Sequence, residues 1–270
     1  MIGFLVAAAV FGMDLRVPPQ VKQGQLLRVE VAPFAQGLSV AFGDKAVPVF
    51  ERTGRGLALM PVPVIQKPGA YEVVVRDGAG KEVDKRKFEV IDAQYPTQNI
   101  RASKAMKALR PMPGEVETMR ALYSTVSPVA YWAEPFAAPV PHCANSSFGV
   151  QRLHNGQPSG NYHRGLDLRS PPGAPVKATA DGTVLVSKMF RMHGGTIGID
   201  HGQGVTSHYL HLSRLGARQG ARVKKGDVVG YVGATGFATG PHLHWGVYVH
   251  GTPTDPRPLT PEVKACAPAR

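Results

Sequence analysis

Short runs in which every second residue is apolar recur along the first third of this chain of 270 residues. In residues 27–31 apolar side chains alternate with Arg28 and Glu30, and residues 38–42 follow the same period. A period of two predicts strands with one buried and one solvated face. With Gly 31 and Pro 24 in the chain, turns are frequent and long helices are few. The sequence therefore predicts a mainly β fold.

A hairpin is predicted between residues 71–75 and 87–91, because both runs alternate and the turn residues Asp77 and Gly78 lie between them. Strands spaced by roughly ten residues suggest a small sandwich. We expect an immunoglobulin-like β-sandwich over residues 14–92. This stretch contains no histidine and no cysteine, so we expect it to bind, space or inhibit rather than to catalyse.

Residues 93–135 are predicted to be a linker with short helices. A basic amphipathic segment at 99–109 is stopped by Pro111 and Pro113, and residues 115–123 have helical spacing with acidic residues in the first turn. The chain then becomes rich in proline. The remaining residues, 136–270, are predicted to form the catalytic domain.

Residues 1–13 contain an apolar run of about signal-peptide length, too short to span a bilayer as a helix. No lysine or arginine precedes the run, so we predict an atypical signal peptide, with a buried N-terminal strand as the alternative. Cys143 and Cys266 fit one disulfide in an oxidising compartment, although two free thiols fit the sequence equally well. We expect export to the periplasm or cell envelope, with no transmembrane span beyond that first segment.

The net charge of +12 at pH 7 favours an anionic partner. The candidates are nucleic acid, a membrane surface and an acidic polymer such as the cell wall. The sequence has no helix-turn-helix, no zinc-finger spacing and no aromatic RNA-binding signature. We therefore expect no nucleic-acid partner and favour the anionic cell wall.

All ten histidines follow residue 141, and two groups of them have the spacing of metal ligands. In an extended strand, His163, Gly165 and Asp167 project from one face, and the glycine leaves room between the other two. His242 and His244 likewise share a face. Two histidines with one carboxylate are a catalytic zinc set, which leaves the fourth position for water. A single histidine is more often a surface or hydrogen-bonded residue, but the joint pattern predicts a zinc site.

A second hairpin is predicted from residues 196–200 and 205–213, and it carries His208 and His211. Residues three apart on a regular strand face opposite sides. We therefore expect only one of these two histidines to face the metal groove, and periodicity alone does not say which.

Together, these motifs resemble the lysostaphin-type (LytM-type) zinc metallopeptidases, which hydrolyse peptidoglycan. The resemblance covers about residues 148–258 and follows the order and spacing of the family's motifs. The matching stretches are Phe148-Gly149, His163-Arg164-Gly165-Leu166-Asp167, Ala180-Asp181-Gly182, Ile199-Asp200-His201-Gly202, Tyr209-Leu210-His211-Leu212-Ser213, Val223-Lys224-Lys225-Gly226-Asp227 and Gly240-Pro241-His242-Leu243-His244.

The resemblance implies a compact antiparallel β catalytic domain with a narrow groove over the metal. It implies that His163, Asp167 and His244 bind Zn²⁺. It also implies that His211 and His242 flank the bound water and the substrate carbonyl, which makes His211 the histidine that faces the groove. His208 beside it is a departure from the family pattern.

The function predicted from this resemblance is zinc-dependent endopeptidase activity on the peptide cross-links or stem peptides of bacterial peptidoglycan. Two alternatives stay open: a non-catalytic regulator that binds the cell wall, and a zinc carboxypeptidase that removes D-Ala. The sequence leaves open which bond is cut and which of His211 and His242 is the general base.

Overall fold

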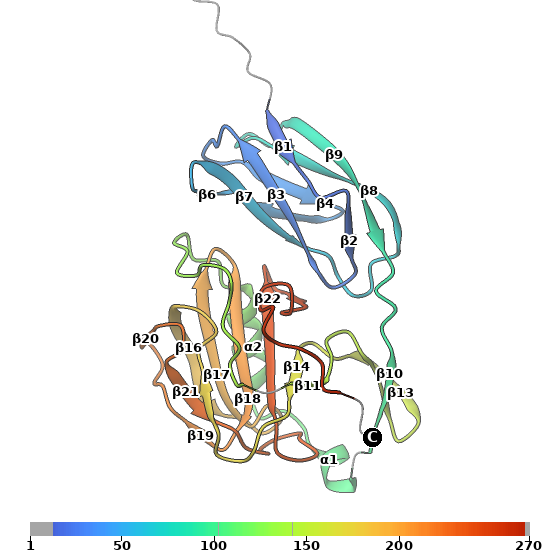
Figure 1. Cartoon of the computed structure of the whole chain (residues 1–270), viewed down its shortest axis with the longest axis vertical. Helices are drawn as coiled ribbons and strands as arrows, with labels where there is room; N and C mark the ends of the chain where they lie inside the picture. Colours follow the sequence, from blue (N-terminus) through green and yellow to red (C-terminus); the bar gives the residue numbers. More distant parts are fainter. Residues whose placement is uncertain (1–12, 102, 142, 268–270) are drawn as a thin grey trace, which may run out of the picture. The chain divides into compact units, whose positions relative to one another are not determined.

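The computed structural model describes residues 13–101, 103–141 and 143–267, so all but the last residue of the predicted signal peptide lie outside the described part. The chain divides into two compact units (Figure 1). One unit is formed by residues up to 20, by 27–60 and by 69–89. The other is formed by residues from 90 onward together with the short segments 21–26 and 61–68.

The N-terminal residues form two sheets, in which strands such as β3 and β4 bury alternate side chains, whereas β7 is buried from Gly56 to Pro61. The first has the strand order β1-β3-β7-β6, and the second has the order β2-β9-β8-β4-β5. Their bounds in chain order are β1 Asp14–Arg16, β2 Gln20–Lys22, β3 Leu26–Ala32, β4 Ser39–Phe42, β5 Lys45–Pro48, β6 Phe50–Arg52, β7 Arg55–Pro61, β8 Gly69–Arg76 and β9 Glu82–Ile91.

Burial along these strands follows the apolar pattern of the sequence. In β3, Leu27 and Val29 are buried while the residues between them are partly exposed. The ring of Phe42 packs edge-on against those of Tyr71 and Phe88, with centroids 5.4 and 5.3 Å apart. Neighbouring strands β8 and β9 confirm the hairpin predicted from residues 71–75 and 87–91. The mainly β character is confirmed, whereas the immunoglobulin-like assignment of residues 14–92 stays a prediction.

An antiparallel sheet forms the centre of the second unit. Its strand order is β11-β14-β22-β18-β17-β16-β20, and β23 pairs with β22. The bounds are β11 Ala144–Ser146, β14 Leu166–Leu168, β16 Gly182–Met189, β17 Gly195–Gly202, β18 Val205–Leu212, β20 Arg222–Val223, β22 Leu243–Val249 and β23 Thr252–Thr254. The antiparallel pairing of β17 with β18 confirms the second predicted hairpin.

Strands β17 and β18 are buried at every position, so their sequences are not simply alternating. One cause is α2 (Glu115–Ser124), which packs Met119 and Leu122 against Val186 and Leu210 of the sheet. Gly198 allows this approach, since a Cβ there would lie 2.4 Å from a methyl carbon of Leu122. The helix predicted at residues 115–123 is therefore part of the core of this unit.

Two small sheets and one further helix complete the second unit. One sheet has the order β15-β21-β19, with bounds β15 Pro175–Lys177, β19 Arg214–Leu215 and β21 Val228–Tyr231. The other has the order β10-β12-β13, with bounds β10 Thr97–Ile100, β12 Gln151–His154 and β13 Gln157–Tyr162. Within it, β10 runs parallel to β12. The short helix α1 covers Lys104–Ala108.

A disulfide joins Cys143 to Cys266. It closes a loop with a sequence separation of 123 residues around the second unit. The disulfide alternative for the cysteine pair is thereby confirmed. Within the described ranges, none of the helices is both long and apolar enough to cross a membrane.

Candidate metal centre

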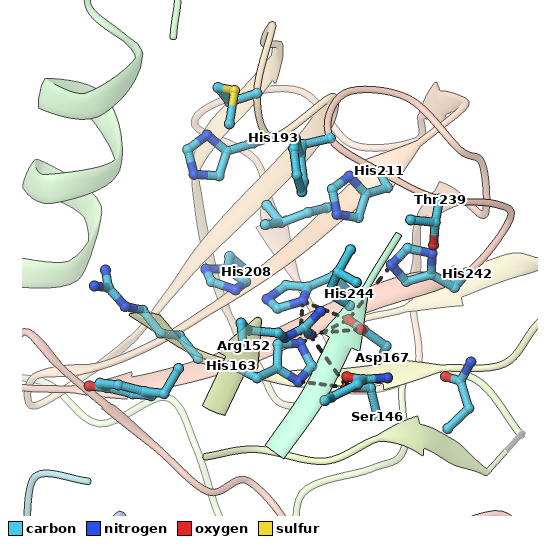
Figure 2. A pocket seen from close by; sticks show the side chains of 18 of the residues that line it. Ser146, Arg152, His163, Asp167, His193, His208, His211, Thr239, His242 and His244 are labelled. Carbon is cyan, nitrogen blue, oxygen red and sulfur yellow. Dashed lines mark hydrogen bonds and ion pairs between the residues drawn. The ribbon is translucent and has the colours of Figure 1, made fainter. Parts of the chain in front are cut away.

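One pocket of the second unit gathers the histidines singled out by the sequence (Figure 2). Strands β14, β18 and β22 of the central sheet contribute to its lining. So do β10 and β12 of the small sheet β10-β12-β13, and helix α2. The five predicted site residues all line it: His163, Asp167, His211, His242 and His244.

Side-chain atoms of His163, Asp167 and His244 converge at the floor of this pocket, as Figure 2 shows. Asp167 Oδ1 lies 2.9 Å from His163 Nε2 and 2.8 Å from His244 Nδ1. The two ring nitrogens are 3.0 Å apart. One carboxylate oxygen and two imidazole nitrogens thus surround a single point.

Strand pairing explains this convergence. Asp167 on β14 lies directly opposite His244 on β22, which puts both side chains on the same face of the sheet. A Cβ at position 165 would lie 2.8 Å from His244 Nε2 and 2.5 Å from the Trp245 carbonyl oxygen. Gly165 is therefore required for His244 to pack this closely against the segment that carries His163, whereas the sequence predicted that the glycine makes room between His163 and Asp167.

Hydrogen bonding fixes which nitrogen of His163 faces the cluster. Its Nδ1 lies 2.8 Å from the carbonyl oxygen of Ser147 and therefore carries the proton. The Nε2 lone pair of the neutral tautomer with its proton on Nδ1 points towards Asp167 and His244. Lone pairs that meet a carboxylate in this way are stabilised by a cation, and a buried N–H to carbonyl bond is the usual support for a metal-binding imidazole. The donor set fits a metal ion such as zinc.

The electrostatics of the cluster favour a charged Asp167 carboxylate and a neutral His244 ring. Burial raises the pKa of Asp167, but His163 and His244 beside it lower it more, so the pKa lies well below its usual range. Burial is also the main cause that lowers the pKa of His244 to about 4. At neutral pH this ring is therefore uncharged and can act as a ligand.

His211 and His242 face each other across the pocket, with ring centroids 5.0 Å apart. Each ring is oriented by a carbonyl: His211 Nδ1 lies 2.8 Å from the Thr235 oxygen, and His242 Nδ1 lies 2.8 Å from the Gly240 oxygen. Burial, and then the neighbouring histidines His244 and His242, lower the pKa of His211 to about 3. His211 is thus a neutral imidazole at pH 7.

The expectation that only one of His208 and His211 faces the groove is wrong, since both line the pocket. On β18, His208 lies opposite Gly246 and Leu210 opposite His244, so their shared face is the groove face. His211 should then point away. Its left-handed backbone, with φ at 63°, and a register shift of the β17–β18 pair turn its side chain back into the pocket.

His208 lies beneath the metal cluster. Its ring is buried, with its centroid 5.3 Å from that of His244, and its Nδ1 is 2.8 Å from the Tyr123 hydroxyl. Gly246 makes room for it, because a Cβ there would come within 2.4 Å of His208 Nε2. His208 therefore packs against a candidate ligand.

Sequence patterns missed three polar residues of the site. Arg152 on β12 pairs with Asp167 Oδ2 at 3.2 Å, and Tyr123 comes from the predicted linker. Glu115, also from that segment, is fully buried and accepts a hydrogen bond from His193, which lines the pocket. The helical spacing around Tyr123 was a visible signal, but nothing local places the helix beside the histidines.

Comparison with known proteins gives a consistent result. The family model for peptidase family M23 matches residues 161–256. The chain is 39% identical over 112 residues to a DD-carboxypeptidase/endopeptidase Mpg of Neisseria meningitidis serogroup B, covering 42% of this chain and 26% of that protein. It is 39% identical over 113 residues to the peptidoglycan DD-endopeptidase ShyC of Vibrio cholerae serotype O1, with the same two shares.

A solved structure from Pseudomonas aeruginosa, assigned to peptidase M23, is similar over most of the chain. The identity is 28% and the TM-score 0.68, over 88% of this chain and 93% of that one. The chain spans about a quarter of the length of the curated relatives it matches. The match to this metallopeptidase family implies a bound metal ion, and His163, Asp167 and His244 are a group that could hold one. Residues 161–256 therefore form a peptidase family M23 domain of the LytM and lysostaphin type.

Proposed function

We propose that this protein is a zinc-dependent endopeptidase that hydrolyses peptide cross-links or stem peptides of bacterial peptidoglycan. The observation that carries the proposal is the cluster of His163, Asp167 and His244, in which three ligand atoms lie within 3.0 Å of one another. Across the same pocket stand two further imidazoles, His211 and His242. A ligand cluster facing two imidazoles suits hydrolysis better than metal storage.

Each group has a role that follows from its position. His163, Asp167 and His244 would hold the zinc ion, which acts as a Lewis acid and lowers the pKa of water towards neutrality. His211 is neutral at pH 7, because its pKa is lowered to about 3 mainly by burial, so its ring can accept a hydrogen bond from the attacking water. His211 and His242 together would take the proton of the attacking water, stabilise the developing oxyanion and protonate the leaving amine.

The substrate class rests on the relatives and on charge. ShyC is named a peptidoglycan DD-endopeptidase, and the matched region of this chain contains the complete five-residue site. The net charge of +12 favours an anionic polymer over a neutral one. The disulfide between Cys143 and Cys266 suits an oxidising compartment. We therefore propose that the protein is exported and acts in the periplasm or cell envelope.

Mass spectrometry of cross-linked stem-peptide dimers after digestion tests this proposal. The expected result is an internal cut that converts each dimer into monomers and is lost in the Asp167→Ala variant. Removal of terminal D-Ala alone would instead identify a carboxypeptidase. Intact dimers after incubation with the folded, zinc-loaded protein would identify a non-catalytic wall-binding protein, and either result would refute endopeptidase function.

A further inference from the structure

One end of the pocket is built differently from the histidine cluster. Three tyrosines and an arginine line it, and we name them the tyrosine–arginine corner: Tyr123, Tyr162, Arg164 and Tyr248. The rings of Tyr123 and Tyr248 are stacked, with centroids 3.7 Å apart and planes 3° from parallel. The Arg164 guanidinium carbon lies 5.6 Å from the centroid of the Tyr162 ring.

The ring of His208 lies between the corner and the candidate metal ligand His244. Tyr123 contacts His208 through its hydroxyl at 2.8 Å, and the ring of His208 lies 5.3 Å from that of His244. Arg164 also follows the candidate ligand His163 directly in the chain. A group bound in the corner would therefore belong to a residue close to the bond that lies over the metal site.

Charge is unbalanced in this part of the pocket. Among the described residues that line the pocket, Asp167 is the single carboxylate. It already pairs with His163, His244 and Arg152. That contact neutralises Arg152. Arg164, by contrast, is exposed and forms no ion pair with a carboxylate within the described ranges. The pocket thus presents one fixed cation without a carboxylate partner.

The tyrosine hydroxyls beside this cation remain protonated. Burial raises the pKa of Tyr248 to about 12 and raises that of Tyr123 well above its usual value. The Tyr123 hydroxyl is already paired with His208 Nδ1, so the Tyr248 hydroxyl is the donor that this part of the pocket offers to a ligand at neutral pH. A planar guanidinium with an adjacent hydroxyl donor suits a carboxylate, which accepts two parallel N–H bonds from arginine.

We propose that the tyrosine–arginine corner is a subsite for a carboxylate of the substrate, so that the preferred substrate is an acidic peptide. This rests on the proposed function, and it adds that the carboxylate belongs to the residue next to the scissile bond. In a stem dimer with a direct diaminopimelate cross-link, that group would be the free carboxylate of the diaminopimelate residue whose amine is released. Tyr123 belongs to α2, outside residues 161–256, so the corner combines the family domain with a segment that precedes it.

Calorimetric titration of the zinc-loaded full chain with two tetrapeptide stems tests the subsite. One stem carries the free diaminopimelate carboxylate, and the other carries a carboxamide in its place. We expect the carboxylate stem to bind about tenfold tighter or more, the usual scale for a hydrogen bond to a charged group. Arg164→Gln should abolish the difference by weakening only the carboxylate stem.

The matched control is Arg214→Gln. Arg214 also stacks on a tyrosine, with its guanidinium carbon 3.6 Å from the Tyr231 ring centroid, but it is not part of the pocket lining. This variant should bind both stems as the wild type does. Equal affinity of the wild type for the two stems, or no binding of either, would overturn the subsite. An equal loss for both stems in Arg164→Gln would overturn it as well.

A parallel rate measurement on the cross-linked dimer separates the subsite from the function. Discrimination between the stems without cleavage of the dimer would support the subsite and refute the endopeptidase. Cleavage without discrimination would support the endopeptidase and refute the subsite.

Discussion

Arg152 fixes how Asp167 faces the metal centre. It holds Asp167 Oδ2 at 3.2 Å, which leaves Oδ1 for His163 and His244 (Figure 2). Two effects on metal affinity oppose each other here. A positive charge beside a cation site weakens binding, whereas a hydrogen bond that orients a ligand strengthens it. Because the Arg152 side chain is only 18% exposed and is held at one ligand oxygen, we expect orientation to dominate.

Replacing Arg152 with alanine should therefore weaken zinc binding about tenfold or more, the usual effect of losing a group that orients a ligand. Competition with a chromophoric chelator measures this affinity without any assay of activity. Arg169→Ala is the control, since Arg169 is an exposed arginine directly after β14. Unchanged or tighter zinc binding in Arg152→Ala would mean that the arginine acts only as a like charge.

His211 is expected to matter for turnover and not for metal binding. His211→Ala should lower the turnover rate by about a hundredfold or more, the scale for losing a positioned acid–base or electrostatic group. Zinc content, measured by elemental analysis, should stay within error of the wild type. Loss of zinc in this variant would make His211 a ligand and would contradict the assignment of the three-residue cluster.

For single residues, the sequence anticipated that His163, Asp167 and His244 lie together, but it did not anticipate their local geometry. Spacing around Gly165 predicted one extended strand through His163 and Asp167, whereas β13 ends at Tyr162 and β14 begins at Leu166. Periodicity failed at His211, because a single left-handed residue reverses the side on which it projects. Arg152 follows no metal-ligand spacing, since its partner Asp167 is reached through tertiary packing.

Helix α2 is fixed to the sheet at the edge of the pocket by one carboxylate. Glu115 is completely buried and accepts hydrogen bonds from the backbone N–H groups of Met112, Arg191, Met192 and His193. Its Oε1 also lies 2.6 Å from His193 Nδ1. The carbonyl of His193 in turn accepts the N–H of His211 at 3.0 Å. The helix is therefore coupled to β18 at His211 through the loop that carries His193.

Glu115→Ala should destabilise the protein by about 3 kcal/mol or more, because several buried N–H groups lose their acceptor. Urea unfolding of the full chain measures the change. Glu117→Ala is the matched control, since Glu117 is an exposed acidic residue in the same first turn, and it should stay within about 0.5 kcal/mol of the wild type. Equal effects in the two variants would mean that the contribution of Glu115 comes from the helix dipole alone.

Hairpins and helices were predictable where neighbouring residues in the sequence carry the signal. The hairpins at 71–91 and 196–213 follow from alternation and turn residues, and the helix at 115–123 follows from its spacing and its acidic first turn. The positions of α2 and β10 were not predictable, because they depend on contacts with residues distant in the chain. For this reason the segment expected to be a linker supplies Gln98 and Tyr123 to the pocket lining.

The disulfide acts on the molecule as a whole. Its large loop restricts the unfolded chain, so replacing both Cys143 and Cys266 with alanine should lower the free energy of unfolding by about 4–5 kcal/mol in the chain-entropy model. Urea unfolding of the double variant and of the reduced wild type should give the same loss. A stability equal to that of the oxidised protein in both samples would contradict a role for the disulfide in holding the second unit.

For the whole chain, the sequence predicted the mainly β fold class, but it did not predict how the chain divides into its two compact units. The short segments 21–26 and 61–68 belong with the second unit by their contacts, although they lie within the stretch predicted as the first domain. Nothing in their composition differs from that of neighbouring turns, and only tertiary contacts reveal where they pack.

In the function proposed here, hydrolysis depends on zinc held by His163, Asp167 and His244. The most direct test strips the purified full chain of metal with a chelator and follows cleavage of cross-linked stem dimers as zinc is added back. We predict that cleavage stops without metal and returns in full at about one zinc per chain. Full cleavage by a demonstrably metal-free sample would contradict the account.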